Sequence, residues 1–265
     1  MKKNRLFRLL LVIPLGLILL LSSECKKKEN DDNNGDVAGS ITDIDGNTYQ
    51  TITAGSQEWM AENLKVTKYK NGDPVTTGLS QSEWDNTTNG AYSYPDNNVS
   101  MGDAYGLLYN WYAATSNKGL CPEGWHVPTH DEWTQFTQYL IANNSNATED
   151  NLGILLKSCR KVNSSLGGNC STSTHPRWDS GGTHDGTDAF GFAALPGGVL
   201  FMGGFFDGFG HAAVWWTTSE VDYSDGNTSE DEVAWFIEVG NHYEFVFENW
   251  EWKASGCSVR CVRNL

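Results

Sequence analysis

The stretch CPEGWHVPTHDEW, residues 121 to 133, concentrates side chains that could do chemistry. It holds a cysteine, two histidines four residues apart and the adjacent acids Asp131 and Glu132. Thiolate, imidazole and carboxylate groups are common metal ligands and acid–base catalysts. Pro128, however, stands between His126 and His130 and prevents one helix from carrying both. The spacing therefore favours a corner of the fold, with His126 in an extended lead-in and His130 in a first helical turn, over a metal or catalytic site.

The rest of the sequence lacks the patterns typical of catalytic sites. No G-x-S-x-G, phosphate-binding loop or H-E-x-x-H sequence occurs, and the six histidines form no motif on one predicted element. The neighbouring acids Glu230, Asp231 and Glu232 favour a solvated loop over a pair of glycosidase carboxylates. We therefore expect no catalytic residue, no bound metal, no cofactor and no enzymatic activity.

The segment DIDGN, residues 43 to 47, is similar to the start of a calcium-binding loop. The glutamate that completes such a loop is missing at the required distance. The same letters, Asp45-Gly46-Asn47, are a turn signal between two runs that alternate apolar and polar residues. The pattern favours a hairpin turn over a calcium site.

Residues 1–24 have the pattern of a bacterial secretion signal. Four basic side chains precede an apolar run from Leu9 to Leu21, which is too short for a comfortable membrane span. The run ends at LSSEC, which resembles a lipoprotein cleavage site with Cys25 as the lipidated residue, although Glu24 stands where such sites carry a small residue. Residues 25–36 form a polar, charged tether that can bury nothing and resembles the surface-export signals of Bacteroidetes lipoproteins. We expect an outer-membrane lipoprotein, exposed at the cell surface and held only by its lipid.

Residues 37–265 are long enough for one domain with a sizeable core. The first 24 residues carry four basic side chains and one acidic one, so the rest of the chain carries −18 rather than the −15 of the whole. This charge disfavours nucleic acid and anionic membrane surfaces as partners.

Export past the inner membrane permits disulfides between the cysteines that follow Cys25. Cys159 and Cys170 flank a short polar loop and are the preferred local pair. Cys121 then pairs with either Cys257 or Cys261, and one thiol is left over. The spacings lack the paired C-x-x-C pattern of a zinc site.

The pattern of apolar residues predicts two or three short helices in the middle of the domain. Residues 104–116 place leucines and aromatic residues at helical spacing. Thr129 and Glu132 form a capping box ahead of an apolar face, which predicts a second helix. A third short helix is expected from Glu149 to Ser158.

The last third of the domain predicts antiparallel strands. Five segments, starting at residues 191, 212, 232, 242 and 257, are rich in β-branched and aromatic residues and are separated by Gly, Asn, Asp and Ser clusters. Helices followed by strands indicate an α+β fold with many loops.

Six motifs appear in order along the domain: NTYQTITAGSQEWMAENLKVTKY, GLLYNWYAA, LCPEGWHVPTHDEW, GFAALPGG, WWTTSE and SVRCVRN. Together they resemble the Fibrobacter succinogenes major paralogous domain, found in lipoproteins of Fibrobacter and Bacteroidetes, over Val37 to Asn264. The resemblance implies a C-type-lectin-like fold related to the formylglycine-generating-enzyme type. On such a fold Cys121 pairs better with Cys261, tying the start of a helix to the last strand and leaving Cys257 free.

The related folds suggest two alternative functions. Oxidase-like enzymes of the formylglycine-generating type need a reactive cysteine pair or a histidine cluster, and residues 257 and 261 on one strand would lie roughly 13 Å apart. Calcium-dependent lectins need a Glu-Pro-Asn or Gln-Pro-Asp triplet followed by Trp-Asn-Asp, and neither occurs. An enzyme and a calcium-dependent lectin are therefore the alternatives to the function that we favour, which is a binding module.

The function that we favour is a non-catalytic binding module for a glycan or protein ligand. The fold presents ligands on its C-terminal strands and loops in variable proteins of phages and bacteria. The segment from Trp215 to Trp252 is dense in aromatic and amide side chains, which give contact area and adaptable hydrogen bonds. Trp125, Trp133, Trp215, Trp235 and Phe236 are expected in the core. We predict that the ligand contacts Tyr223, Asn227, His242, Tyr243, Asn249 and Trp250.

Overall fold

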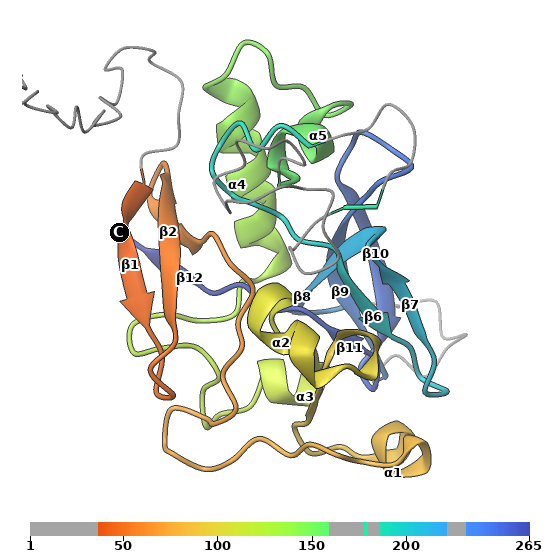
Figure 1. The fold of residues 1–265 in the computed structure, drawn as a ribbon. Coiled ribbons are helices and arrows are strands. Elements are labelled where there is room, and N and C mark those ends of the chain that lie inside the picture. The colour runs from red at the N-terminus through yellow and green to blue at the C-terminus, as the bar shows by residue number, and fades with distance from the viewer. Residues whose placement is uncertain (1–36, 159–177, 180–185, 222–231) are drawn as a thin grey trace, which may run out of the picture. The chain divides into compact units, whose positions relative to one another are not determined.

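The first and last strands that the structure describes lie in the same sheet (Figure 1). The computed structural model describes residues 37–158, 178–179, 186–221 and 232–265. The first sheet is antiparallel, in the order β1 (Val37–Thr42), β2 (Thr48–Ala54), β3 (Gln57–Met60) and β12 (Val262–Asn264). The expected hairpin turn is confirmed, because the turn after Asp43 joins β1 to β2.

The second sheet holds the other strands. Its order is β10-β9-β8-β6-β11-β5-β4, and β7 pairs with β6 beside this path. The pair β6 and β8 is parallel, so the predicted run of antiparallel strands is mixed at this point. The bounds are β4 (Tyr92–Ser93), β5 (Leu108–Asn110), β6 (Gly197–Leu200), β7 (Phe206–Phe209), β8 (Ala212–Glu220), β9 (Val233–Gly240), β10 (Phe247–Trp252) and β11 (Gly256–Cys257).

The predicted α+β class is confirmed, but two or three helices are too few. The described residues form α1 (Gln81–Asn86), α2 (Val99–Tyr105), α3 (Trp111–Ala114), α4 (His130–Ala142) and α5 (Leu152–Leu156), with a short 3-10 turn at Pro95–Asn97. Most are a single turn or two, which a search for long apolar periodicity does not detect. Within the described ranges, none of these helices has the length and apolar character needed to cross a membrane.

The helix predicted over residues 104–116 is wrong in its centre. Helix α2 ends at Tyr105, β5 occupies Leu108–Asn110, and α3 begins only at Trp111. Gly106 lies between them with a φ of 79°, and a Cβ there would approach Cβ of Asn63 to 2.6 Å. Glycine alone adopts that backbone angle without strain, so the helix stops and the chain enters the sheet.

Two buried cores lie on opposite faces of β8 and β9. Val214 and Trp216 face one core, and Ala213 and Trp215 face the other, as alternation along a strand requires. Helix α4 covers the second core. Its Trp133 ring lies 4.7 Å from that of Trp59 and 5.6 Å from that of Trp215.

Four of the six sequence motifs meet around one side chain, Arg260, which is completely buried. Its guanidinium donates to Oδ1 of Asn63 at 2.9 Å and to the carbonyls of Phe192 and Ala193. The indole of Trp215 donates to the same Asn63 oxygen at 2.9 Å. Burial lowers the pKa of Arg260 to about 9, although Glu62 and Asp188 oppose the shift. Four of the six motifs are therefore explained by packing.

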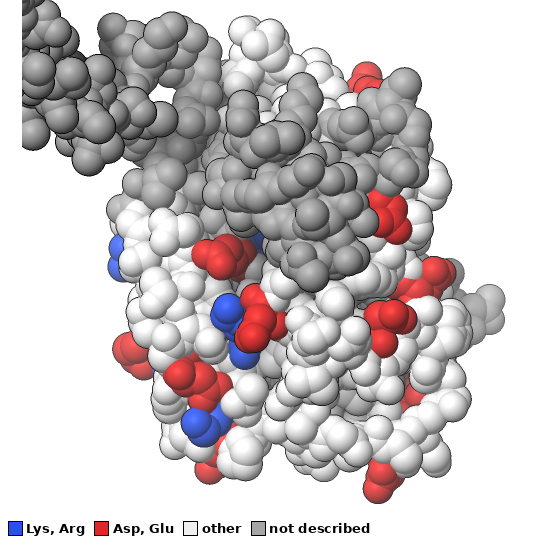
Figure 2. Space-filling model, in the orientation of Figure 1, with Lys and Arg blue, Asp and Glu red and all other residues white. Residues whose placement is uncertain are grey.

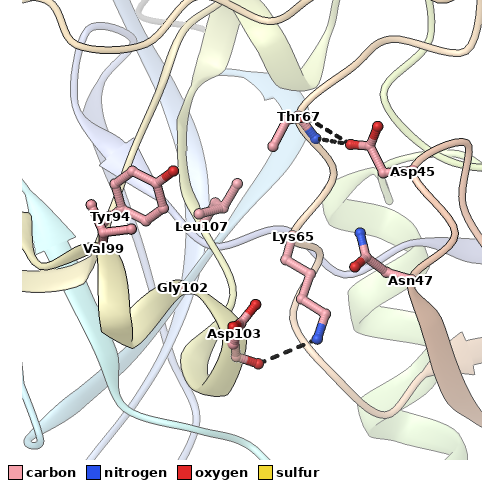
Figure 3. Close-up of a pocket in the computed structure, with 9 residues that line it drawn as sticks. All are labelled: Asp45, Asn47, Lys65, Thr67, Tyr94, Val99, Gly102, Asp103 and Leu107. Carbon is pink, nitrogen blue, oxygen red and sulfur yellow. Dashed lines mark hydrogen bonds between the residues drawn. The ribbon is translucent and has the colours of Figure 1, made fainter.

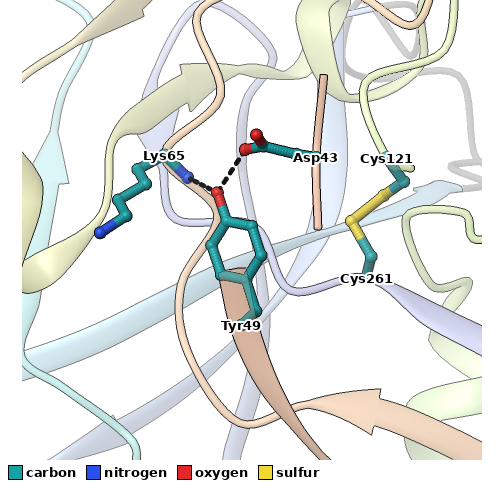
Figure 4. Close-up of a disulfide and its surroundings, with 5 residues drawn as sticks. All are labelled: Asp43, Tyr49, Lys65, Cys121 and Cys261. Atoms are coloured by element: carbon teal, nitrogen blue, oxygen red, sulfur yellow. Dashed lines mark hydrogen bonds between the residues drawn. A yellow bond between two sulfur atoms is a disulfide. The ribbon is translucent and has the colours of Figure 1, made fainter. Parts of the chain in front are cut away.

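A disulfide joins Cys121 to Cys261, with the two Cα atoms 5.9 Å apart (Figure 4). It connects the segment that leads into α4 with the residue before β12. The predicted pairing is confirmed, and Cys257 is a buried free thiol in the other sheet. The predicted pair Cys159 and Cys170 lies outside the described residues. In Figure 4 the Tyr49 hydroxyl nearby donates to Asp43 at 2.6 Å and accepts from the backbone N–H of Lys65 at 3.0 Å.

Candidate functional site

The histidines of the 121–133 stretch serve the fold separately. Nε2 of His126 lies 2.7 Å from Oε1 of Glu132, and the backbone of His126 pairs with Val262. Glu132 also completes the capping box of α4 with Thr129. Burial alone would raise the pKa of Glu132, but the Thr129 N–H and His126 lower it below its ordinary value. The stretch is a structural corner, as its sequence predicts.

The other histidine of the stretch belongs to a different neighbourhood. Nε2 of His130 lies 2.9 Å from Oε2 of Glu248 on β10, and its ring lies 4.8 Å from that of Trp235 on β9. His126 and His130 thus have separate carboxylate partners. In the part of the chain that the structure describes, no group of three or more His, Cys, Asp or Glu side chains could hold a metal ion.

The carboxylates of the DIDGN turn are occupied by hydrogen bonds from their own chain. Oδ1 of Asp43 accepts from the backbone N–H groups of Asp45 and Asn47 at 2.9 Å. Oδ2 of Asp45 accepts from the N–H and the hydroxyl of Thr67 at 2.6 and 2.7 Å (Figure 3). Its other oxygen meets the ammonium of Lys68 at 2.7 Å. These bonds build the turn and leave its acids engaged.

A shallow pocket of about 280 Å³ opens beside this turn (Figure 3). The ring of Tyr94 forms one wall and lies so close to Gly102 that a Cβ there would come within 2.8 Å of it. The Lys65 ammonium crosses to the carbonyl of Asp103 at 3.3 Å. The pocket is open and mixed in character, and none of the predicted ligand residues lines it.

The free thiol is poorly placed for chemistry. Cys257 is fully buried on β11, and burial raises the pKa of its thiol well above the ordinary value, with Glu251 and Glu238 adding to the shift. The thiolate is the reactive form of cysteine, so this environment makes it unreactive. Cys261, the other half of the sequence pair, is engaged in the disulfide.

Four of the six predicted ligand residues come together on one hairpin. His242 and Tyr243 lie between β9 and β10, and Asn249 and Trp250 lie on β10, which ends the sheet. Tyr223 and Asn227 lie outside the described residues. Trp215 is fully buried as expected, whereas Trp235 is half-buried, because it lies near the sheet edge where His130 covers it.

The four residues do not share one face of the sheet. The register pairs Phe247 with Glu238 and Asn249 with Phe236, so these residues lie on one face. It pairs Trp250 with Trp235, which places Trp250 on the opposite face. Tyr243 belongs to the first face, because its hydroxyl donates to the Glu238 carboxylate.

The sequence analysis missed two aromatic residues of this hairpin, Phe245 and Phe247. They are 43% and 38% exposed, comparable with Trp250 at 40%. The rings of Tyr243 and Phe245 stack with centroids 4.8 Å apart, and Phe247 lies 6.4 Å from Tyr243. The alternation in YEFVFE, with an aromatic ring at every second position, is the signal that could have identified them.

Buried contacts hold this hairpin in place. The ammonium of Lys157, fully buried at the end of α5, donates to the carbonyls of Gly240 and Tyr243 at 2.7 and 3.3 Å. The N–H of Ile154 donates to the carbonyl of Glu244 at 3.0 Å. The aromatic side chains are therefore presented by a fixed backbone, which lowers the entropy lost when they bind.

The fold is a disulfide-bonded α+β domain, and four of its six sequence motifs pack together around the buried Arg260. The chain matches the Fibrobacter succinogenes major domain over residues 52–263, and it belongs to that family. No curated protein and no solved structure matches the chain.

Proposed function

We propose that this chain is a surface-displayed lipoprotein whose domain binds a glycan or a protein without catalysis. Its contact surface is the exposed face of the β9–β10 hairpin, which we call the aromatic face and define as Glu238, Tyr243, Phe245, Phe247 and Asn249. The single observation that carries the proposal is the row of exposed, stacked rings on this rigid hairpin.

Exposed rings at alternate positions of one hairpin are costly in a domain with no partner. Burying large apolar side chains contributes roughly 1.5–3 kcal/mol each, so a folded chain gains by covering them. Contiguous exposed apolar surface rimmed by polar groups is typical of interaction sites. The Glu238 carboxylate and the Asn249 amide supply such a rim beside the rings.

The proposal of surface display rests on the N-terminal segment of the chain. The apolar segment ending at Cys25 and the polar residues 25–36 are those of a lipidated, tethered protein. A tether would let the acidic domain stand away from an anionic cell surface. The α+β architecture is consistent with the C-type-lectin-like fold that the sequence motifs imply.

The two alternatives gain less support from the described residues. An oxidase of the formylglycine-generating type would need a thiol pair, whereas Cys261 is in a disulfide and Cys257 is buried. A calcium-dependent lectin would need carboxylates free to bind the ion, whereas those of Asp43 and Asp45 accept internal hydrogen bonds.

The test is a binding screen of the full-length protein in mild detergent against glycan and protein arrays. Tyr243→Ala and Phe247→Ser should each weaken a captured ligand, by about 2 kcal/mol if the ring is a hot spot. Tyr139→Ala is the matched control, since Tyr139 is 40% exposed on α4, away from this hairpin. Thermal unfolding shows whether each variant is folded. Unchanged affinity in folded aromatic-face variants would contradict the proposal.

A further inference from the structure

The part of the chain that builds β6 to β10 contains no Lys or Arg. From Trp178 to Trp252 there are 75 residues with fourteen Asp and Glu and no Lys or Arg. This segment therefore carries −14 of the charge of the chain. Charge of one sign over a connected surface produces a potential of several kT and attracts ligands of opposite sign.

Within the described residues, the basic side chains of other segments that approach this sheet do not expose their charged groups on its surface. Lys157, Lys253 and Arg260 approach this sheet, and all three are buried. The ammonium of Lys253 lies 4.4 Å from the centroid of the Trp111 ring and 3.3 Å from Glu220. Figure 2 shows the blue side chains over the β1 and β12 side of the domain, whereas the β7 and β10 side shows red without blue.

Carboxylates accompany the exposed rings closely. Glu244 precedes Phe245 in the sequence YEFVFE, and the register places Glu238 opposite Phe247 on the aromatic face. Glu248, by contrast, pairs with Ile237 and lies on the other face of the sheet, where His130 contacts it. A ring attracts a Lys or Arg side chain through its face, and a neighbouring carboxylate adds charge attraction. Rings with neighbouring carboxylates are therefore complementary to a side chain that carries a cation on an apolar stem.

We propose that the ligand of the aromatic face is an extended polypeptide segment rich in Lys and Arg, bound along β10. This inference rests on the proposed function and names its ligand class. Strand β10 has six residues and so spans roughly 20 Å, enough for several side chains of an extended peptide. The stems of Lys and Arg cover apolar surface while their charged ends stay in water beside Glu238 and Glu244.

The charge selects this occupant over the other classes. A neutral glycan would stack on the rings but gain nothing from the acidic surroundings. Anionic lipid surfaces and nucleic acids would be repelled. A basic segment satisfies both the rings and the acids.

The experiment uses the full-length protein in a non-ionic detergent and three labelled peptides of equal length: oligolysine, oligoglutamate and a glycine–serine repeat. Fluorescence anisotropy measures affinity at low salt and at about 0.5 M salt, where charge interactions are strongly screened. Oligolysine should bind, the other two should not, and salt should weaken the complex. Phe247→Ser should weaken binding about two- to fivefold.

Charge variants decide whether the aromatic face is the site. The double variant Glu238→Gln with Glu244→Gln should weaken oligolysine binding, whereas Asp103→Asn with Glu123→Gln, which removes the same charge elsewhere, should not. Equal weakening by both pairs would show attraction to net charge alone and overturn the inference. So would an absence of oligolysine binding. A glycan captured by the wild type and lost in Phe247→Ser would overturn this inference while supporting the proposed function.

Discussion

At the scale of single residues, Arg260 connects segments that lie far apart in the sequence. Its position in SVRCVRN, between alternating apolar residues, is typical of an exposed strand residue, yet it is fully buried and its donors reach Asn63, Phe192 and Ala193. The sequence does not show this, because the acceptors are about 70 and 200 residues away and two of them are backbone carbonyls. By contrast, the burial of Trp133 could be predicted from its helical spacing alone.

Replacing Arg260 by Met should destabilise the domain by about 3 kcal/mol or more. The change removes a buried cation and takes away the guanidinium donors of the Phe192 and Ala193 carbonyls, each costing roughly 1–3 kcal/mol. Urea unfolding measures the loss. Lys118→Met is the control, since both partners of the Lys118–Asp73 pair are exposed and solvent screens their attraction. Similar midpoints for both variants would contradict the role given to Arg260.

Glu238 makes the stability depend on pH. Burial raises the pKa of its carboxyl, and the Tyr243 hydroxyl that donates to it only partly opposes the shift. The folded protein therefore holds this proton more tightly than the unfolded chain, so the group lowers stability as pH rises from about 4.5 through its raised pKa.

Glu238→Gln should therefore unfold at a higher temperature than the wild type near neutral pH, and the difference should shrink as the pH falls towards 4.5. Thermal scans across this range check the trend. Glu123→Gln provides the control, because its side chain is 87% exposed. A constant difference at every pH would rule out a titrating Glu238.

At the scale of elements, those determined by nearby residues could be predicted from the sequence, whereas those determined by pairing with distant residues could not. The capping box of Thr129 and Glu132 predicted α4 because both partners lie within one helical turn. The β1–β2 turn was predicted for the same reason. Strand β5 was missed because its pairing with β11 joins Tyr109 to Cys257, far along the chain, and tertiary pairing overrides helical spacing.

The Cys121–Cys261 disulfide links the segment that leads into α4 with the residue before β12, across 140 residues. Replacing both cysteines by Ser should destabilise the domain by about 2–5 kcal/mol, because the unfolded chain regains its freedom. Reductant should lower the midpoint of the wild type more than that of the double variant, in which only the predicted Cys159–Cys170 bond would remain to be reduced. Cys257→Ala, which removes a buried thiol but no crosslink, should remain sensitive to reductant. A wild-type midpoint unaffected by reductant would contradict the prediction.

At the scale of the whole molecule, the sequence predicted the α+β class and the family but not the strand order. The pairing of β12 with β3 brings the two ends of the domain together, and only the folded chain shows it. The sequence predicted the location of the candidate site but not all of its residues. Polar and aromatic density pointed to the last hairpin, whereas the exposed Phe245 and Phe247 needed the register of β9 and β10.

The lipid anchor is tested on the intact cell. Cys25→Ala should remove the protein from the outer-membrane fraction, because the acyl chains that hold it would be lost. Fractionation with immunoblotting measures the distribution, and protease added outside the cells tests exposure. Unchanged membrane association of the variant would refute the anchor.

The segment without Lys or Arg, residues 178–252, also determines how trypsin digests the protein. Trypsin cuts after Lys and Arg, and between Arg177 and Lys253 it finds no such bond, even in an unfolded chain. Five strands, β6 to β10, lie within that interval. Complete digestion should release residues 178–253 as one cysteine-free peptide, detectable by mass spectrometry. Outside a cell, where such proteases act, the same composition would leave these five strands with no cleavage site of their kind.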